Sequence, residues 1–141
     1  MPFMESADYK YVSDTLSQIR IGSRYTYAEL VDNADLSHKY RSMIRRFFLE
    51  EVSADTTLES HLYYLKPGTV SYAVYTAVGA KAGIYLPQEK ILRDGSIEIV
   101  WKEETVKLRD LADLSPEEKK KAGIFIHELS LSKAGLAAYA M

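Results

Sequence analysis

Hydrophobic residues recur at intervals of three and four over the first fifty positions, and this spacing predicts helices. Ser6 can cap a first helix that runs to about residue 19, and Gly22 would stop that helix just past its end. The stripe of this helix consists of Tyr9, Val12, Leu16 and Ile19.

Two more helices are predicted between residues 26 and 48. Thr26 and Glu29 have the T-x-x-E spacing of a capping box, so a short helix should run from about Tyr27 to Asn33. Residues 34–36 are too few for anything but a turn, and Ser37 can cap the next helix. One face of that helix is apolar, with Tyr40, Met43, Ile44, Phe47 and Phe48. The three helices are expected to enclose a core of Leu16, Ile19, Leu30, Ile44, Phe47 and Phe48.

The outer face of the last of these helices is basic. No acid occurs between Leu36 and Leu49, although the whole chain has 20 acidic and 18 basic residues. A short capped helix, a tight turn and a longer helix within residues 22–52 resemble the helix-turn-helix and winged-helix arrangement, whose second helix can enter the major groove of DNA. The residues that this resemblance assigns to nucleic-acid binding are Arg24, Ser37, His38, Lys39, Arg41, Ser42, Arg45 and Arg46. The alternative is a solvated face that keeps the protein in solution.

The middle of the chain is predicted to form strands. His61–Leu65 has the composition of a strand, and Pro67-Gly68 marks a turn after it. Residues 70–78 alternate between larger and smaller side chains, which favours a second strand, and the two together would form the wing of a winged helix. A helix over 70–78 is the alternative, because Ala73, Ala77 and Ala80 are also spaced for one.

A hairpin is predicted around Asp94-Gly95, a dipeptide that suits a tight primed turn. Its strands are 91–93 and 96–101, and residues 106–108 are expected to add a third. The alternation places Ile97, Ile99 and Trp101 on one face, so one side of this small sheet can be buried. The opposite face carries Glu98, Val100 and Lys102.

The last thirty residues contain a second strong helix start. Ser115, Pro116 and Glu118 provide a cap, a first-turn proline and a capping-box acid, and Gly123 is expected to end or kink the helix. Residues 124–126 should be buried, and 132–141 should form a closing helix or a dimer contact. Dimerisation through this segment is a hypothesis, based on four apolar residues that must be buried against another surface: Leu129, Leu131, Leu136 and Tyr139.

These elements predict an α+β fold in a single domain of 141 residues. A three-helix, helix-turn-helix-like unit over residues 1–55 would precede a small antiparallel sheet over 56–110 and a C-terminal helical segment over 111–141. The apolar content of 47% is ordinary for a folded soluble protein. There is no cysteine, signal-peptide pattern or membrane-length apolar run, so a cytoplasmic location without membrane contact is expected.

No motif for catalysis or for metal binding is found in the sequence. The three histidines, His38, His61 and His127, are far apart, and His127-Glu128 lacks the second histidine of a zinc-protease motif because Leu131 stands in its place. We therefore predict no catalytic residues, no metal and no cofactor, and expect a binding protein and not an enzyme.

Two functions follow from these observations. The leading hypothesis is a nucleic-acid-binding protein that uses the basic helix, with a regulator as one form of it. The net charge of −2 requires that contact to be local. The alternative is a protein–protein interaction module, either an adaptor or an inhibitor of another protein. It is motivated by the excess of acidic over basic residues, the nearly uncharged stretch 60–88, and the eleven tyrosines. Tyrosine is favoured at surfaces that contact partners, but it also suits a half-buried sheet.

Overall fold

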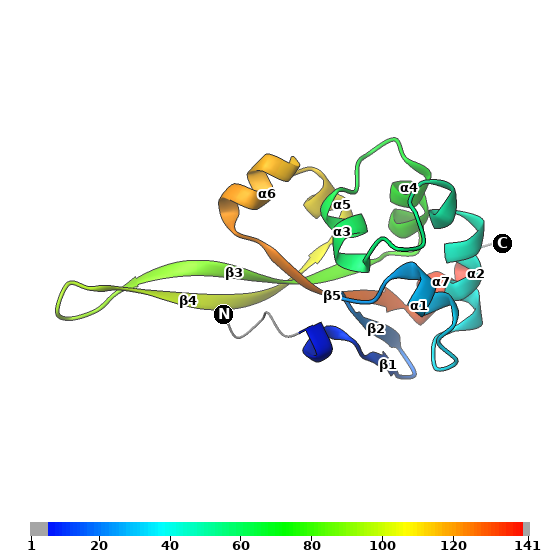
Figure 1. Ribbon diagram of the computed structural model, residues 1–141, viewed down its shortest axis with the longest axis horizontal. Helices are drawn as coiled ribbons and strands as arrows, with labels where there is room; N and C mark the ends of the chain where they lie inside the picture. The colour runs from blue at the N-terminus through cyan, green and yellow to red at the C-terminus, as the bar shows by residue number, and fades with distance from the viewer. Residues whose placement is uncertain (1–5, 140–141) are drawn as a thin grey trace.

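The described part of the chain begins with a short 3-10 helix and two strands and ends with a strand and a helix. In the computed structural model the described residues are 6–139 (Figure 1). The strands are β1 (Val12–Asp14), β2 (Gln18–Gly22), β3 (Lys81–Ile91), β4 (Ile97–Lys107) and β5 (Phe125–Ser132). The helical segments are η1 (Ser6–Tyr9), α1 (Tyr27–Val31), α2 (His38–Arg46), η2 (Phe48–Glu50), α3 (Leu58–Tyr63), α4 (Val70–Ala77), α5 (Leu108–Ala112), α6 (Pro116–Ala122) and α7 (Lys133–Ala138).

The strands form one five-stranded antiparallel sheet in the order β1-β2-β5-β3-β4. The last strand of the chain, β5, therefore lies at the centre and joins two hairpins, β1–β2 and β3–β4. Strands that face a core on one side only alternate between buried and exposed side chains. In β2, for example, Ile19 and Ile21 are buried while Arg20 between them is exposed.

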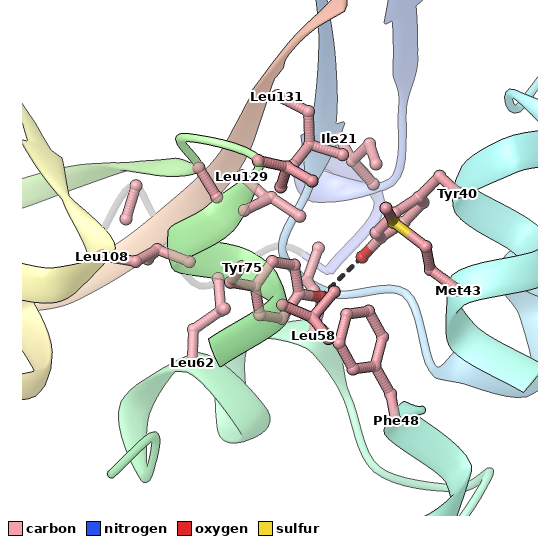
Figure 2. Packing of buried hydrophobic residues seen from close by; sticks show 14 of the residues in the cluster. Ile21, Tyr40, Met43, Phe48, Leu58, Leu62, Tyr75, Leu108, Leu129 and Leu131 are labelled. Atoms are coloured by element: carbon pink, nitrogen blue, oxygen red, sulfur yellow. Dashed lines mark hydrogen bonds between the residues drawn. The ribbon is translucent and has the colours of Figure 1, made fainter. Parts of the chain in front are cut away.

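The core lies between one face of this sheet and the helices. Figure 2 shows Ile21, Leu129 and Leu131 of the sheet packed near Tyr75 of α4 and Tyr40 of α2. Sheet residues share this core with side chains from α1, α2, α3, α4, α5 and α7. None of the helices within residues 6–139 has the length and apolarity that a membrane crossing requires.

The predicted N-terminal three-helix unit is wrong. The segment expected to form the first helix is instead η1, β1 and β2, and Leu16 lies in the β1–β2 turn with 99% of its surface exposed. Gly22 is part of β2 and not a helix stop: a Cβ atom there would lie 2.1 Å from the carbonyl oxygen of Tyr9. The spacing of three and four was coincidental, because pairing with β5 decides the structure of this segment.

The predicted strands at 61–65 and 70–78 are also wrong, and the helical alternative for 70–78 is confirmed. Thr57 caps α3 by accepting a hydrogen bond from the backbone N–H of Ser60, and Thr69 caps α4 in the same way from Tyr72. These caps fix helix starts that side-chain alternation alone does not reveal. Consequently the predicted wing does not exist at these residues.

Three of the predictions based on local caps are confirmed. Thr26–Glu29 and Ser115–Glu118 each form the full capping box, and Gly123 ends α6 with a left-handed φ of +71°. Ser37 does stand at the start of α2, but its side chain makes no capping hydrogen bond. The closing helix is α7.

The hairpin at Asp94-Gly95 is confirmed and is much longer than predicted. Its two strands have 11 residues each and pair from Ile91↔Ile97 down to Lys81↔Lys107. The third strand predicted at 106–108 does not form, because Val106 and Lys107 end β4 and Leu108 begins α5. The outer half of this hairpin projects from the rest of the molecule (Figure 1).

Candidate functional site: a projecting β-arm

The outer part of the β3–β4 hairpin, residues 86–102, forms a two-stranded ribbon that we call the arm. β5 pairs with β3 only as far as Tyr85, opposite Phe125. Two residues further along β3 is Pro87, which has no N–H to offer a third strand. The sheet therefore narrows to two strands at this point, and the ribbon continues alone to the Asp94-Gly95 turn (Figure 1).

The arm has one apolar face. Directly opposed residues of an antiparallel pair point to the same side, so the cross-strand register assigns the faces. The apolar face contains Pro87 with Trp101, Glu89 with Ile99, and Ile91 with Ile97; the polar face contains Leu86 with Lys102, Gln88 with Val100, and Lys90 with Glu98. The predicted alternation is confirmed, but the apolar face is not buried: Ile91, Ile97 and Ile99 are 76%, 61% and 51% exposed.

This exposure is costly for an isolated chain. A two-stranded ribbon is only marginally stable in water, and a flat apolar edge invites pairing with other chains. Burial of a fully exposed isoleucine contributes about 1.5–3 kcal/mol. Ile91, Ile97 and Ile99 are between half and about three-quarters exposed, so covering them together still yields a substantial part of that free energy. A cluster of this kind typically marks an interaction site.

An aromatic cluster lies where the apolar face meets the body of the protein. Tyr85, on the same face as Pro87, lies 4.3 Å from the ring of His127, centroid to centroid. The ring centroids of Phe125 and Tyr9 are 5.2 Å apart. The guanidinium carbon of Arg24 lies 5.3 Å from the centroid of the same Phe125 ring. Burial raises the pKa of Tyr85, and the nearby Glu103 raises it further. The apolar surface of the arm thus continues onto the sheet.

A second feature, missed in the sequence, is a chain of hydrogen bonds buried in the core. The Tyr75 hydroxyl lies 2.8 Å from that of Tyr27 and 2.7 Å from that of Tyr40, and Tyr27 also bonds Nδ1 of His61. Figure 2 shows the Tyr40–Tyr75 bond between α2 and α4. Because these residues come from four separate helices, no local sequence pattern predicts the network. The high number of tyrosines was the only sign of it in the sequence.

His61 lies at the end of this network beside a cavity of about 600 Å³, which Glu51 and Lys66 also line. Burial lowers the pKa of His61 to about 4, against the opposing effect of Glu51. The imidazole is therefore neutral near pH 7 and can exchange hydrogen bonds without carrying charge. Residues 6–139 contain no group of three or more histidine or acidic side chains arranged to hold a metal ion.

The structure brings most of the predicted nucleic-acid-binding residues together on α2 but leaves Arg24 apart. Arg24 forms an ion pair with Glu59 at 3.2 Å, away from α2. Along α2, His38, Arg45 and Arg46 are exposed, and the other predicted members, Ser37 at its cap, Lys39, Arg41 and Ser42, are half-buried.

The cations of α2 contact backbone and rings instead of acids. Lys39 donates to the carbonyl of Ala137 at 3.4 Å, Arg45 donates to the carbonyl of Val31 at 3.1 Å, and the Arg46 guanidinium lies 5.5 Å from the centroid of the neighbouring Phe47 ring. Over the part of the chain that the structure describes, these three and Arg41 form no ion pair with a carboxylate.

Comparison with known proteins adds no assignment. No protein-family model matches the sequence, and no curated protein shows significant sequence similarity to it.

Proposed function

We propose that this protein is a protein–protein interaction module that binds a partner polypeptide through the apolar face of the arm. The observation that carries the proposal is the exposure of Ile91, Ile97 and Ile99 on a ribbon that projects from the body (Figure 1). A surface of this composition gains free energy when another apolar surface covers it.

The charges of the arm define the partner further. Residues 86–102 contain three acids and three bases, so the arm offers no excess of positive charge to a polyanion. On the apolar face itself the only charged residue is Glu89. The partner surface should therefore be apolar with a cation at its border, which is the chemistry of a protein and not of a nucleic acid.

Crosslinking from single positions of the arm tests this proposal. A photoreactive amino acid is introduced at Ile99, on the apolar face, and as a matched control at Glu98, one residue away on the polar face. After irradiation in the native cells and nuclease treatment, position 99 should give one stoichiometric protein adduct and position 98 should give little. An adduct of twice the chain mass would identify a second copy as the partner. Equal crosslinking from both positions, or none from 99, would refute the proposal.

A second candidate function is nucleic-acid binding by α2, favoured by the absence of carboxylate partners for Lys39, Arg41, Arg45 and Arg46 among the described residues. Each phosphate contact steepens the log–log salt dependence of affinity by about 0.9. Arg41→Ala with Arg45→Ala should weaken binding to duplex DNA and reduce this slope by up to about 1.8.

The control for this titration removes the same charge elsewhere. Lys120→Ala with Lys121→Ala deletes two exposed cations of α6. If both double variants weaken binding equally, the contact is a general charge effect and α2 is not the site.

A further inference from the structure

Two lysines stand directly opposite each other where the β3–β4 hairpin joins the body. Lys81 begins β3, Lys107 ends β4, and the register pairs them, so both side chains project on the same face. Like charges in this arrangement destabilise a sheet. Neither amine has a carboxylate partner in the segment 6–139. The two exposed cations thus share one face of the sheet without a neutralising acid among the residues that the structure describes.

A cavity of about 250 Å³ lies beside this pair, between the end of α4 and the start of α5. Its lining residues are Thr76, Gly79, Ala80, Lys81, Lys107 and Arg109, and they include three cations and no acid. Among these three cations, Arg109 forms an ion pair with its neighbour Asp110 at 3.9 Å, and both side chains are more than half exposed. Such a pair does little to neutralise the guanidinium.

Thr76 lines this cavity, but its hydroxyl does not face it. Its oxygen is buried and has no hydrogen-bond partner in the described part of the protein. A threonine within a helix ordinarily bonds the carbonyl of the preceding turn, so a buried hydroxyl without a partner is uncommon. The oxygen is out of reach of a ligand, so the groups that can bind one here are the three cations that line the cavity.

We propose that this cavity binds the phosphate group of a small phosphorylated molecule. A phosphate dianion placed here would separate the opposed lysine amines and accept hydrogen bonds from them and from the Arg109 guanidinium. A second cavity of about 220 Å³ adjoins the first, since Gly79 and Lys81 line both. Ser17, Gln18, Ser130 and Ser132 complete its lining with uncharged donors and acceptors, which suits the remainder of such a ligand.

Calorimetric titration with inorganic pyrophosphate, in a buffer free of phosphate and sulfate, tests the site. The intact chain should bind with a stoichiometry of one. Lys107→Glu should weaken binding at least tenfold, because it removes a charge-assisted hydrogen bond and adds a repulsive acid. The same variant converts a like-charge pair into an attractive one with Lys81, so its melting temperature should stay equal or rise. Opposite effects on binding and stability would exclude loss of folding as the cause.

Two further variants complete the test. Thr76→Val, of nearly the same shape, keeps all three cations and should leave pyrophosphate binding unchanged, because the hydroxyl oxygen is buried. Lys120→Glu on α6 makes the same charge reversal at an exposed site and should leave binding unchanged. The proposal is overturned if the intact chain shows no binding up to about 10 mM pyrophosphate, or if both charge reversals act equally. Tighter binding of a single-stranded oligonucleotide through Lys107 would overturn the assignment to a small molecule.

Discussion

Acidification from pH 7 to pH 4.5 should destabilise the protein in part through His61. Burial lowers the pKa of this imidazole from its ordinary 6.5 to about 4, with Glu51 acting in the opposite direction. The unfolded chain takes up a proton below pH 6.5, while the folded protein does not do so until about pH 4. The neutral His61 therefore causes no loss in the free energy of unfolding above pH 6.5. The loss grows as the pH drops and levels off below about pH 4.

The magnitude follows from the two pKa values. One pKa unit corresponds to about 1.36 kcal/mol, so the total loss approaches about 3.4 kcal/mol and reaches about 2.5 kcal/mol at pH 4.5. For a chain of this length the loss amounts to roughly 6–12 °C in melting temperature. His127, whose pKa is also lowered by burial, adds to the loss, and so do Glu29, Glu51 and Glu118, whose carboxyl pKa values are lowered in the folded protein. Glu59, whose pKa burial raises, opposes it. A comparison of variants is needed to isolate His61.

The assay is urea denaturation at several pH values between 7 and 4.5 for the intact protein and for His61→Gln. Glutamine can still bond the Tyr27 hydroxyl but has no proton to gain in this range. The intact protein should be the more stable of the two at pH 7, and the difference should shrink by about 2.5 kcal/mol at pH 4.5. His38→Gln, the same change at an exposed site, is the control. If the difference between the intact protein and His61→Gln stayed constant across this range, the assignment of the buried neutral imidazole would be wrong.

Three more predictions concern stability. Tyr75→Phe deprives two buried tyrosine hydroxyls of a partner and should cost about 2–4 kcal/mol in urea denaturation, against about 1 kcal/mol for Tyr40→Phe at the end of the network; equal costs would contradict the connectivity. Ile97→Thr with Ile99→Thr should leave the melting temperature within about 2 °C, because both side chains are exposed, while abolishing partner capture; a large drop in melting temperature would show that the arm packs on its own body. Gly22→Ala should cost more than about 2 kcal/mol, since its Cβ would meet a backbone oxygen of η1, and a measured cost near zero would contradict that close contact.

The sequence predicted some of the elements whose cause lies within a few residues, although the equally local caps of α3 and α4 were missed. The capping boxes at Thr26 and Ser115 and the turn at Asp94-Gly95 are formed by side chains and backbone groups that are neighbours in sequence, and all three are confirmed. Elements fixed by distant partners were missed. Gln18–Gly22 is a strand because it pairs with β5, and no property of the segment alone competes with that pairing.

The candidate site could be predicted only in part. The period of two correctly placed Ile97 and Ile99 on one face, but periodicity cannot tell whether a third layer covers that face. The opposition of Lys81 and Lys107 depends on a hairpin register that extends far beyond the turn, so the predicted short strands could not reveal it. Binding of nucleic acid by α2 stays a prediction. A C-terminal dimer was suggested by four apolar side chains that needed to be buried. Three of them, Leu129, Leu131 and Leu136, are buried in the core of the same chain, so they do not require a dimer.

The central position of β5 has a consequence for synthesis of the protein. Leu129 pairs with Ile21 on one side and with Ala82 on the other, so the two hairpins cannot be joined until the ribosome has released residues 125–132. Until then the nascent chain carries two unsatisfied strand edges, the kind of surface that chaperones protect and that aggregates form on. A messenger truncated before codon 125 should yield insoluble product, and a peptide spanning β5, supplied during refolding, should rescue it.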